Sequence, residues 1–465
     1  MIDYEGFLKD KKITIMGLGI LGRGLGYTKF LAECGVDLIV TDLKTREQLA
    51  TSVKALSKFK NIKFVLGEHR LEDFSTGGGS AFSGRSPDMV IKSAGVPLHS
   101  IYISEAKKNN IPVEMDISLF AKCAPEVMIV GVTGTRGKSM TTALIYEILS
   151  KNLKGRNVFL GGNVRGVATL PLLKKVNPPA GGGDILVCEL DSWQLQGFGE
   201  ARISPHISVF TSFMPDHMNY YKNSMKDYFN DKANIFKYQK KDDVLIIRPG
   251  VKKFIPSLWG GSGRGWAKLI VVNKKNVANW KFTVPGEHNR ENLACAVKVA
   301  EQFNIPISKI KKAVAEFKGV EGRLQLLRIY KGIKVYNDNN ATTPEATIAG
   351  IKAFSPKQGF GKKIVLICGG VDKKLDLTNF VKVINKNCKF VSLIPGTGTN
   401  ILLREYELKI PYEVGKDFKD VIQKAITYAK KGDIVLFSPA FASFGMFNNE
   451  YERNDLFMKI IKGLK

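Results

Sequence analysis

The apolar residues of this chain are grouped into short runs, and most of these runs end in glycine, an acid or a hydroxyl residue. Stretches with helical spacing lie between them. Short continuous apolar runs alternating with helical patterns are typical of buried parallel strands covered by helices. The first part of the chain contains the runs ITIMG (13–17), DLIVTD (37–42), IKFVLG (62–67), DMVIKSAG (88–95) and IPVEMD (111–116).

The same pattern continues along the rest of the chain. A second group comprises VMIVGV (127–132), DILVCELDS (184–192) and HISVFTS (206–212). A third group comprises IKVYNDN (333–339), KIVLICGG (363–370), FVSLIPG (390–396) and DIVLFSPA (433–440). A chain of 465 residues is too long for one core, so we expect successive α/β units. Three glycine-rich stretches (75–84, 178–183 and 259–266) are predicted to be exposed loops.

Composition narrows the classes of protein. No apolar run approaches the roughly 20 residues that span a bilayer, and the N-terminal residues lack the apolar core of a signal peptide. The six cysteines are scattered without a CxxC pair, which favours reduced thiols in the cytoplasm over disulfides or a zinc site. We therefore expect a cytoplasmic protein with no membrane partner, and a monomer.

The net charge of +27 comes from 70 Lys and Arg against 43 Asp and Glu. The basic residues are spread along the whole chain, which favours a solvated lysine-rich surface over a nucleic-acid site. Such a surface also attracts small polyanions such as nucleotides.

The run GVTGTRGKS (131–139) lies between a predicted strand and a predicted helix (140–150). Its three glycines would let backbone N–H groups surround phosphate oxygens, while Lys138 reaches the terminal phosphates and the Ser139 hydroxyl ligates Mg²⁺. The spacing departs from the usual P-loop because Val132 stands where a glycine is expected. The alternative is a glycine-rich turn that binds nothing.

A second glycine loop opens the chain. The predicted strand at 13–17 leads into Gly17, Gly19 and Gly22, and the next predicted strand ends in Asp42. This arrangement is the dinucleotide-binding fingerprint, and it predicts a pyrophosphate at the first helix N-terminus. The pattern leaves open whether the ligand is NAD, another nucleotide diphosphate or nothing.

The order of the motifs resembles the Mur ligase family. The motifs are GTRGKS, GGN, ELDSWQL, DH, the lysine of YFNDKANIF, GEHNRENLACA, GRLQ, YNDNNATTP and SPAFASFGMF. The resemblance implies three α/β domains: a Rossmann-like UDP-substrate domain (1–116), a central P-loop domain with a mostly parallel sheet (117–320) and a Rossmann-like amino-acid-binding domain (321–465). The first domain and the SPAFAS stretch resemble members that add D-glutamate to UDP-N-acetylmuramoyl-L-alanine in peptidoglycan synthesis.

The resemblance implies ATP-driven amide ligation with Mg²⁺. The substrate carboxylate attacks the γ-phosphate of ATP, and the amine of D-glutamate then displaces phosphate from the acyl phosphate. Lys138, Asn163, His217 and Lys232 would be catalytic. The metal ligands would be Ser139, Glu189, His217 and Lys232, the last carbamylated by CO₂. By residue type alone, Glu189 could instead cap a helix and Lys232 could be a surface lysine.

The resemblance also assigns binding residues. ATP would contact Gly134, Thr135, Arg136, Gly137, Lys138, Ser139, His288, Asn289, Asn292, Arg323 and Asp338. The UDP substrate would contact Leu18, Gly19, Ile20, Thr41, Asp42 and Lys44. Lys373 and Ser443 would bind the D-glutamate carboxylates. Asn289 could alternatively be a helix N-cap.

Four positions depart from the family pattern, namely Arg136, Asn219, Asn340 and Gly445, where an asparagine, an acid, a lysine and an aspartate are usual. These departures bear on amino-acid specificity and rate. Three other functions also stay open. One is a related ligase that adds a different amino acid. Another is a nucleotide-binding protein without ligase activity. A third is an NAD-dependent dehydrogenase, which would leave the P-loop unused.

Overall fold

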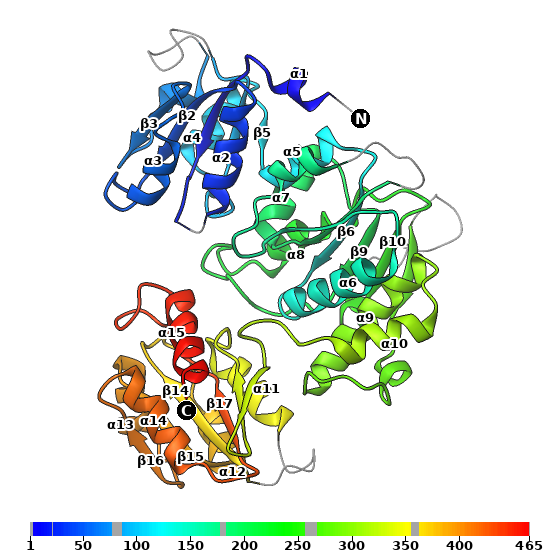
Figure 1. The fold of residues 1–465 in the computed structure, drawn as a ribbon. Helices are drawn as coiled ribbons and strands as arrows, with labels where there is room; N and C mark the ends of the chain where they lie inside the picture. The colour runs from blue at the N-terminus through cyan, green and yellow to red at the C-terminus, as the bar shows by residue number, and fades with distance from the viewer. Residues whose placement is uncertain are drawn as a thin grey trace. The chain divides into compact units, whose positions relative to one another are not determined.

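The computed structural model describes residues 3–20, 22–76, 86–176, 183–255, 267–354 and 362–464. Within them the chain forms three separate sheets with helices between their strands, so the predicted α/β class is confirmed (Figure 1). The three glycine-rich stretches predicted as loops lie outside the described residues, except for Ser75, Thr76 and Gly183.

The chain divides into two compact units. The first comprises Met1–Asn276 with Asn292–Ile310, and the second comprises Val277–Glu291 with Lys311–Lys465. Two sheets belong to the first unit and one to the second, and the division passes through α9 (Glu287–Gln302) and α10 (Ile307–Glu316). The domain limits at 116/117 and 320/321 fall between the strands of consecutive sheets and stay predictions.

The first sheet has five parallel strands in the order β3-β2-β1-β4-β5. Alternate residues of β1 face opposite sides: Ile13 and Ile15 pack with α2 and α3, whereas Met16 packs with α4. Both faces are therefore covered, as an all-parallel sheet requires. The elements are α1 (Tyr4–Leu8), β1 (Lys12–Met16), α2 (Arg23–Glu33), β2 (Asp37–Asp42), α3 (Ala50–Leu56), β3 (Ile62–Leu66), β4 (Met89–Lys92), α4 (Ile101–Lys108) and β5 (Val113–Glu114).

The second sheet has six parallel strands in the order β11-β10-β9-β6-β8-β7. One apolar cluster, which includes Ile15 of β1, Phe120 of α5 and Leu186 of β8, joins it to the first sheet. The sequence did not predict β7, β10 or β11. The elements are α5 (Asp116–Cys123), β6 (Met128–Thr133), α6 (Lys138–Asn152), β7 (Val158–Gly162), β8 (Ile185–Glu189), α7 (Ser192–Ala201), β9 (Ile207–Phe210), α8 (Met225–Ala233), β10 (Val244–Ile247) and β11 (Lys268–Val271).

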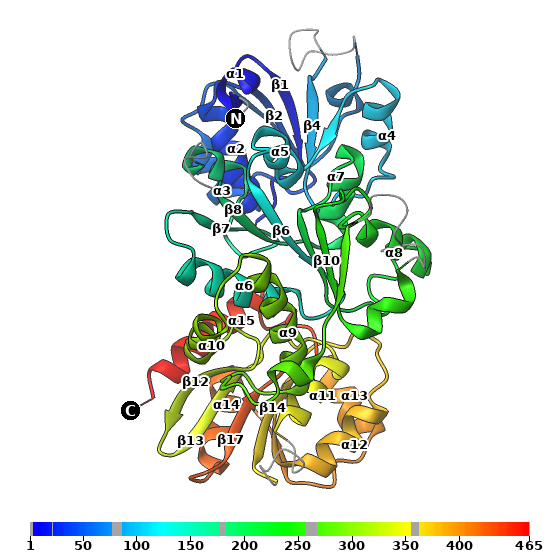
Figure 2. The ribbon, with the colours of Figure 1, turned by 90° about the vertical axis from the view of Figure 1, so that its right-hand side faces the viewer.

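The third sheet has the order β12-β13-β17-β14-β15-β16, with β12 antiparallel to β13 and the other pairs parallel. Helices α14 and α15 contribute to the core on one face, while α11 and α12 pack together (Figure 2). The sequence missed β12 and β16. The elements are β12 (Gln325–Tyr330), β13 (Ile333–Asn337), α11 (Pro344–Ala353), β14 (Ile364–Gly369), α12 (Thr378–Asn387), β15 (Cys388–Ile394), α13 (Thr397–Glu405), β16 (Tyr412–Val414), α14 (Phe418–Tyr428), β17 (Ile434–Phe437) and α15 (Glu450–Lys462).

Within the described residues no helix is both long and apolar enough to cross a bilayer. All six cysteines are free thiols.

Candidate nucleotide and amino acid sites

The P-loop follows β6, and its glycines have different roles. Gly134 has φ 140°, and a Cβ at this position would lie 2.2 Å from Thr211 Oγ1, so only glycine fits. Gly137 has φ 94° and stands at the N-cap of α6. Gly131, in contrast, lies inside β6, where an added Cβ would lie 2.5 Å from Pro205 Cγ. The expectation that all three glycines wrap phosphate is therefore wrong for Gly131, whose small size accommodates a packing neighbour.

The segment after β9 holds the loop in place. The Thr135 N–H donates to Ser212 O at 2.8 Å, and the Arg136 N–H donates to Ser212 Oγ at 2.8 Å. The Thr211 hydroxyl donates to Arg136 O at 2.6 Å. A loop fixed by such bonds needs little reorganisation when an anion binds.

Two lysines converge on this loop. Lys138 Nζ donates to Gly134 O at 3.0 Å and to Thr135 O at 3.4 Å, and Lys232 Nζ donates to Gly134 O at 3.1 Å. Lys232 is only 1% exposed, so it is not the surface lysine that its residue type alone allowed. Its burial, together with the charge of Lys138, holds the pKa of Lys232 well below its usual value.

Glu189 ends β8, where it pairs in register with Val132 of β6, just before the P-loop. It is 5% exposed, and no hydrogen bond or ion pair to its carboxylate is found among the described residues. The helix-capping alternative is excluded because Asp191 caps α7 by accepting from the Gln194 N–H. A buried carboxylate without a protein donor fits a hard divalent cation such as Mg²⁺.

No group of three or more His, Cys, Asp or Glu side chains in the described part of the chain is arranged as a metal site. Mg²⁺ commonly takes only one or two protein carboxylates and completes its shell with phosphates and water. Ser139 of the P-loop and Glu189 beside it fit that mode of binding. The described residues contain no site in which three or more such side chains alone would coordinate a metal.

His217 has a left-handed backbone (φ 56°), and its ring lies 4.7 Å from the ring of Trp193, centroid to centroid. Desolvation lowers the pKa of His217 below its usual value, and the charges of Lys138 and Lys232 act in the same direction. Asp216 opposes this effect and also pairs with Arg136 NH1 at 2.9 Å. His217 therefore lies within electrostatic reach of both Lys138 and Lys232.

Asn163 and Asn292 both lie against this region. The Asn163 N–H donates to Glu189 O at 2.7 Å, which places the GGN turn at the end of β8. Asn292 Oδ1 accepts from the Thr141 hydroxyl at 3.0 Å and from the buried Arg248 guanidinium. A Cβ on Gly137 would lie 2.9 Å from Arg248 NH2, so Arg248 is a P-loop neighbour that the sequence did not reveal.

In the first sheet, the glycine loop and the end of β2 are joined through Asp42. Its carboxylate accepts from the Gly19 N–H at 2.9 Å and from the Lys44 N–H at 2.9 Å. The Thr41 hydroxyl lies 2.7 Å from His69 Nδ1. The structure thus brings Gly19, Thr41, Asp42 and Lys44 together. Asp42, the acid of the dinucleotide fingerprint, is hydrogen-bonded within the protein. Leu18 is buried, whereas Ile20 is exposed.

The second unit contains the other predicted nucleotide residues. His288 and Asn289 lie in the first turn of α9, which begins at Glu287, so Asn289 is not the N-cap. Asn289 Nδ2 donates to Pro285 O at 2.7 Å. Asp338 follows β13 and accepts from the Ser438 hydroxyl at 2.8 Å and from the Leu324 N–H at 3.1 Å. Burial raises the pKa of Asp338 to about 7.

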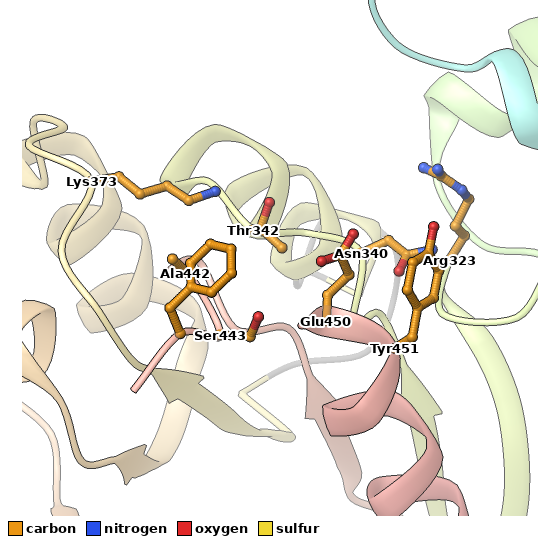
Figure 3. Close-up of a pocket in the computed structure, with 9 residues that line it drawn as sticks. Arg323, Asn340, Thr342, Lys373, Ala442, Ser443, Glu450 and Tyr451 are labelled. Carbon is orange, nitrogen blue, oxygen red and sulfur yellow. The ribbon is translucent and has the colours of Figure 1, made fainter. Parts of the chain in front are cut away.

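A pocket of about 310 Å³ lies at the carboxyl ends of the third-sheet strands and is built entirely within the second unit (Figure 3). It contains both predicted amino-acid-binding residues, Lys373 and Ser443, and the predicted nucleotide residue Arg323. Sequence reasoning missed Glu450 and other lining residues, because nothing in the local pattern places the start of the last helix beside these loops. The lining residues are Arg323, Asn340, Thr342, Lys373, Ala442, Ser443, Phe444, Glu450 and Tyr451.

These features define a class of protein: an α/β protein with a P-loop and a second, dinucleotide-type glycine loop. The Mur ligase middle domain model matches residues 132–255, and the Mur ligase, glutamate ligase domain model matches residues 322–441. Curated relatives named UDP-N-acetylmuramoylalanine–D-glutamate ligase include one from Roseiflexus sp., 33% identical over 98% of this chain and 99% of its own length. Another, from Borreliella afzelii, is 33% identical over 98% of both chains. The chain belongs to the Mur ligase family.

Solved structures agree at the level of the fold. A UDP-N-acetylmuramate–alanine ligase of Thermotoga maritima has a TM-score of 0.58 at 19% identity, covering 98% of this chain and all of that chain. The MurF ligase of the same organism, solved with ADP, has a TM-score of 0.53 at 19% identity and covers 81% of this chain and 90% of that one.

Proposed function

We propose that this chain is an ATP-dependent ligase that joins D-glutamate to UDP-N-acetylmuramoyl-L-alanine and releases ADP and phosphate. Similarity to relatives of that name over nearly the full chain supports the substrate assignment. The observation that carries the ATP half of the reaction is the fixed P-loop, with Lys138 and Lys232 both at Gly134 O.

In the first step, the substrate carboxylate attacks the γ-phosphorus of ATP. An O–P bond forms to give an acyl phosphate, while the bond from the γ-phosphorus to the bridging oxygen breaks and ADP leaves. This transfer depends on positioning and on neutralising phosphate charge. Lys138 and the backbone of residues 134–139 would bind the β- and γ-phosphates, and Arg136 would add a cation to the site.

In the second step, the D-glutamate amine attacks the acyl carbon. A C–N bond forms, the C–O bond to phosphate breaks, and the proton lost by the amine nitrogen passes to the released phosphate or to water. Lys373 and Ser443 would hold the amino acid carboxylates, Asn163 would lie near the γ-phosphate, and His288, Asn289, Asn292, Arg323 and Asp338 would contact the nucleotide.

Mg²⁺ would neutralise phosphate charge in both steps, and Ser139, Glu189 and His217 would hold it. Lys232 would join this set as a carbamate, in which its neutral amine forms an N–C bond to CO₂ and releases a proton. The lowered pKa of Lys232 favours the neutral amine that this reaction needs. For the UDP substrate, the glycine loop of Leu18, Gly19 and Ile20 would bind the pyrophosphate. Cytoplasmic location and a monomeric state stay predictions.

The test is ADP release by the purified chain with ATP, Mg²⁺ and UDP-N-acetylmuramoyl-L-alanine, using a panel of D- and L-amino acids. We expect release that depends on D-glutamate, and a product whose mass corresponds to the amide. Turnover with a different amino acid would reassign the specificity within the family. ADP formation that is independent of every amino acid would contradict the ligase proposal.

A further inference from the structure

The pocket of the second unit contains charges of both signs. Lys373, on the loop after β14, and Glu450, the first residue of α15, both line it. Figure 3 shows the lysine amine and the Glu450 carboxylate on its walls, with the Ser443 hydroxyl below them in this view. The Lys373 ammonium and the Ser443 hydroxyl can donate hydrogen bonds to a ligand carboxylate, whereas the Glu450 carboxylate would repel it. The function of Glu450 is therefore not explained by binding of the two D-glutamate carboxylates.

Buried contacts fix the backbone at Glu450. Asn339 Nδ2 donates to Glu450 O at 3.0 Å, and Asn449 caps α15 by accepting from the N–H groups of Tyr451 and Glu452. Arg453, 1% exposed, donates to Asn339 Oδ1 at 2.8 Å and to Asn339 O at 3.1 Å. The start of α15 is thus attached to the loop after β13, and Glu450 is presented from a defined position.

The Glu450 side chain interacts with its surroundings through its charge, which opposes the lowering by burial of the pKa of Arg453. Among the described residues, its carboxylate takes part in no hydrogen bond and in no ion pair within 4.0 Å. Glu450 is the first residue of α15 and lines the pocket. The pocket therefore presents an anionic group to whatever binds there.

Another residue of the pocket lining, Asn340, is uncharged. Its amide is engaged with Glu321 O at 3.4 Å and with Asn339. Lys373 and Arg323 are the cations among the lining residues, and Glu450 is the acid. A ligand with carboxylates and an ammonium group complements this set better than a simple dianion does.

We propose that Glu450 binds the ammonium group of the incoming amino acid, while Lys373 and Ser443 hold its carboxylates. This assignment rests on the proposed ligase function and makes Glu450 a specificity-determining residue. An amino acid held at both ends has one orientation in the pocket, so its amine is presented in a defined direction. A charge-assisted hydrogen bond of this kind corresponds to about 10- to 100-fold in affinity.

The test compares D-glutamate with glutarate, which has the same two carboxylates and no amine. Glu450→Gln is made in the full chain, and Glu452→Gln is the matched control. Glu452 lies two residues after Glu450, does not line the pocket and accepts from Asn448, so it controls for loss of a charge in the same turn. The KM for D-glutamate and the inhibition constant of glutarate are measured by ADP release.

We expect Glu450→Gln to raise the KM for D-glutamate about 10- to 100-fold and to leave the glutarate constant unchanged or lower. Glu452→Gln should change neither. Equal changes for both ligands would overturn the proposal, because Glu450 would then act on the carboxylates. No change for either ligand would also overturn it. If the Gln variant does not fold, as judged by thermal melting, Glu450→Ala is measured in its place.

Failure of the ligase proposal gives a different result. Wild-type protein would then release no ADP with D-glutamate, whereas failure of the Glu450 assignment alone leaves wild-type turnover intact. If wild type uses another amino acid, the same variants are compared with that acid and its deaminated analogue. A KM unaffected by Glu450→Gln would overturn the assignment there as well.

Discussion

Lys138 and Lys232 donate to the same carbonyl oxygen, that of Gly134, at 3.0 and 3.1 Å. One lysine begins α6 and the other lies near the end of α8, so two helices distant in sequence direct their amines at one point of the P-loop. Ionisation of both amines at once is unfavourable, because the two charges would repel each other and burial adds to the cost for Lys232. A bound polyphosphate, or conversion of one amine to an anion, relieves that repulsion.

Lys138→Ala should abolish ADP release without unfolding the protein. Loss of a cation that positions phosphate should cost about 10²- to 10³-fold in turnover. The free energy of unfolding should change by only about 0.5 kcal/mol, since the loop faces the ligand site. Lys151→Ala, on the same helix and paired with Glu147, is the control and should be nearly silent in both assays. Wild-type turnover in Lys138→Ala would refute the P-loop assignment.

Lys232→Ala should also cut activity severely, and acetate in the buffer should restore part of it by replacing the missing carbamate near the metal. Lys226, exposed on the same helix, provides the control substitution. In wild type, removal of CO₂ should lower activity, and ¹³C-bicarbonate should give a carbamate signal in NMR. If acetate fails to rescue the variant and no signal is found, Lys232 acts as a lysine and the carbamate is excluded.

Asp338 should make the second unit less stable as the pH rises. Its pKa is about 7 in the folded protein against an ordinary value of 3.8, so the unfolded chain loses this proton at lower pH than the folded one does. The free energy of unfolding should therefore fall between about pH 4 and pH 7. Urea unfolding at a series of pH values should show this slope in wild type and a smaller slope in Asp338→Asn.

Asp376→Asn is the control for that series. Asp376 is exposed, and its hydrogen bonds from Thr378 lower its pKa, so its own contribution has the opposite sign. An unchanged slope in Asp338→Asn would mean that the carboxylate is ionised inside the folded protein at neutral pH.

The first glycine loop should bind a uridine diphosphate and not NAD. The Asp42 carboxylate already accepts from the Gly19 and Lys44 N–H groups, so it is engaged in positioning the loop. Calorimetry should detect UDP-N-acetylmuramoyl-L-alanine but not NAD at the same concentrations. Asp42→Ala should weaken that binding while leaving the KM for ATP unchanged. NAD binding accompanied by hydride transfer would favour the dehydrogenase alternative.

The strands that the sequence missed are mostly those at the edges of the sheets. β7, β11, β12 and β16 each pair on one side only, and their residues are mostly half-buried or exposed. β12 and β16 have no continuous apolar run to mark them, whereas β7 (VFLGG) and β11 (KLIV) have runs of only three apolar residues. β10 is different, because its residues VLII are all buried, and its sequence carries the same signal as the strands that were predicted.

The sequence by itself determined the α/β class, the main strands and the two glycine loops, because strand, helix and turn preferences act over a few neighbouring residues. Only the tertiary structure decided that Lys232 is buried against Gly134, that Asp42 accepts from Gly19, and that Glu450 lines the pocket with Lys373. Each of these relationships joins residues far apart in the chain. Parallel strands place their carboxyl ends at one edge of a sheet, and that packing, which no local pattern encodes, brings the groups together.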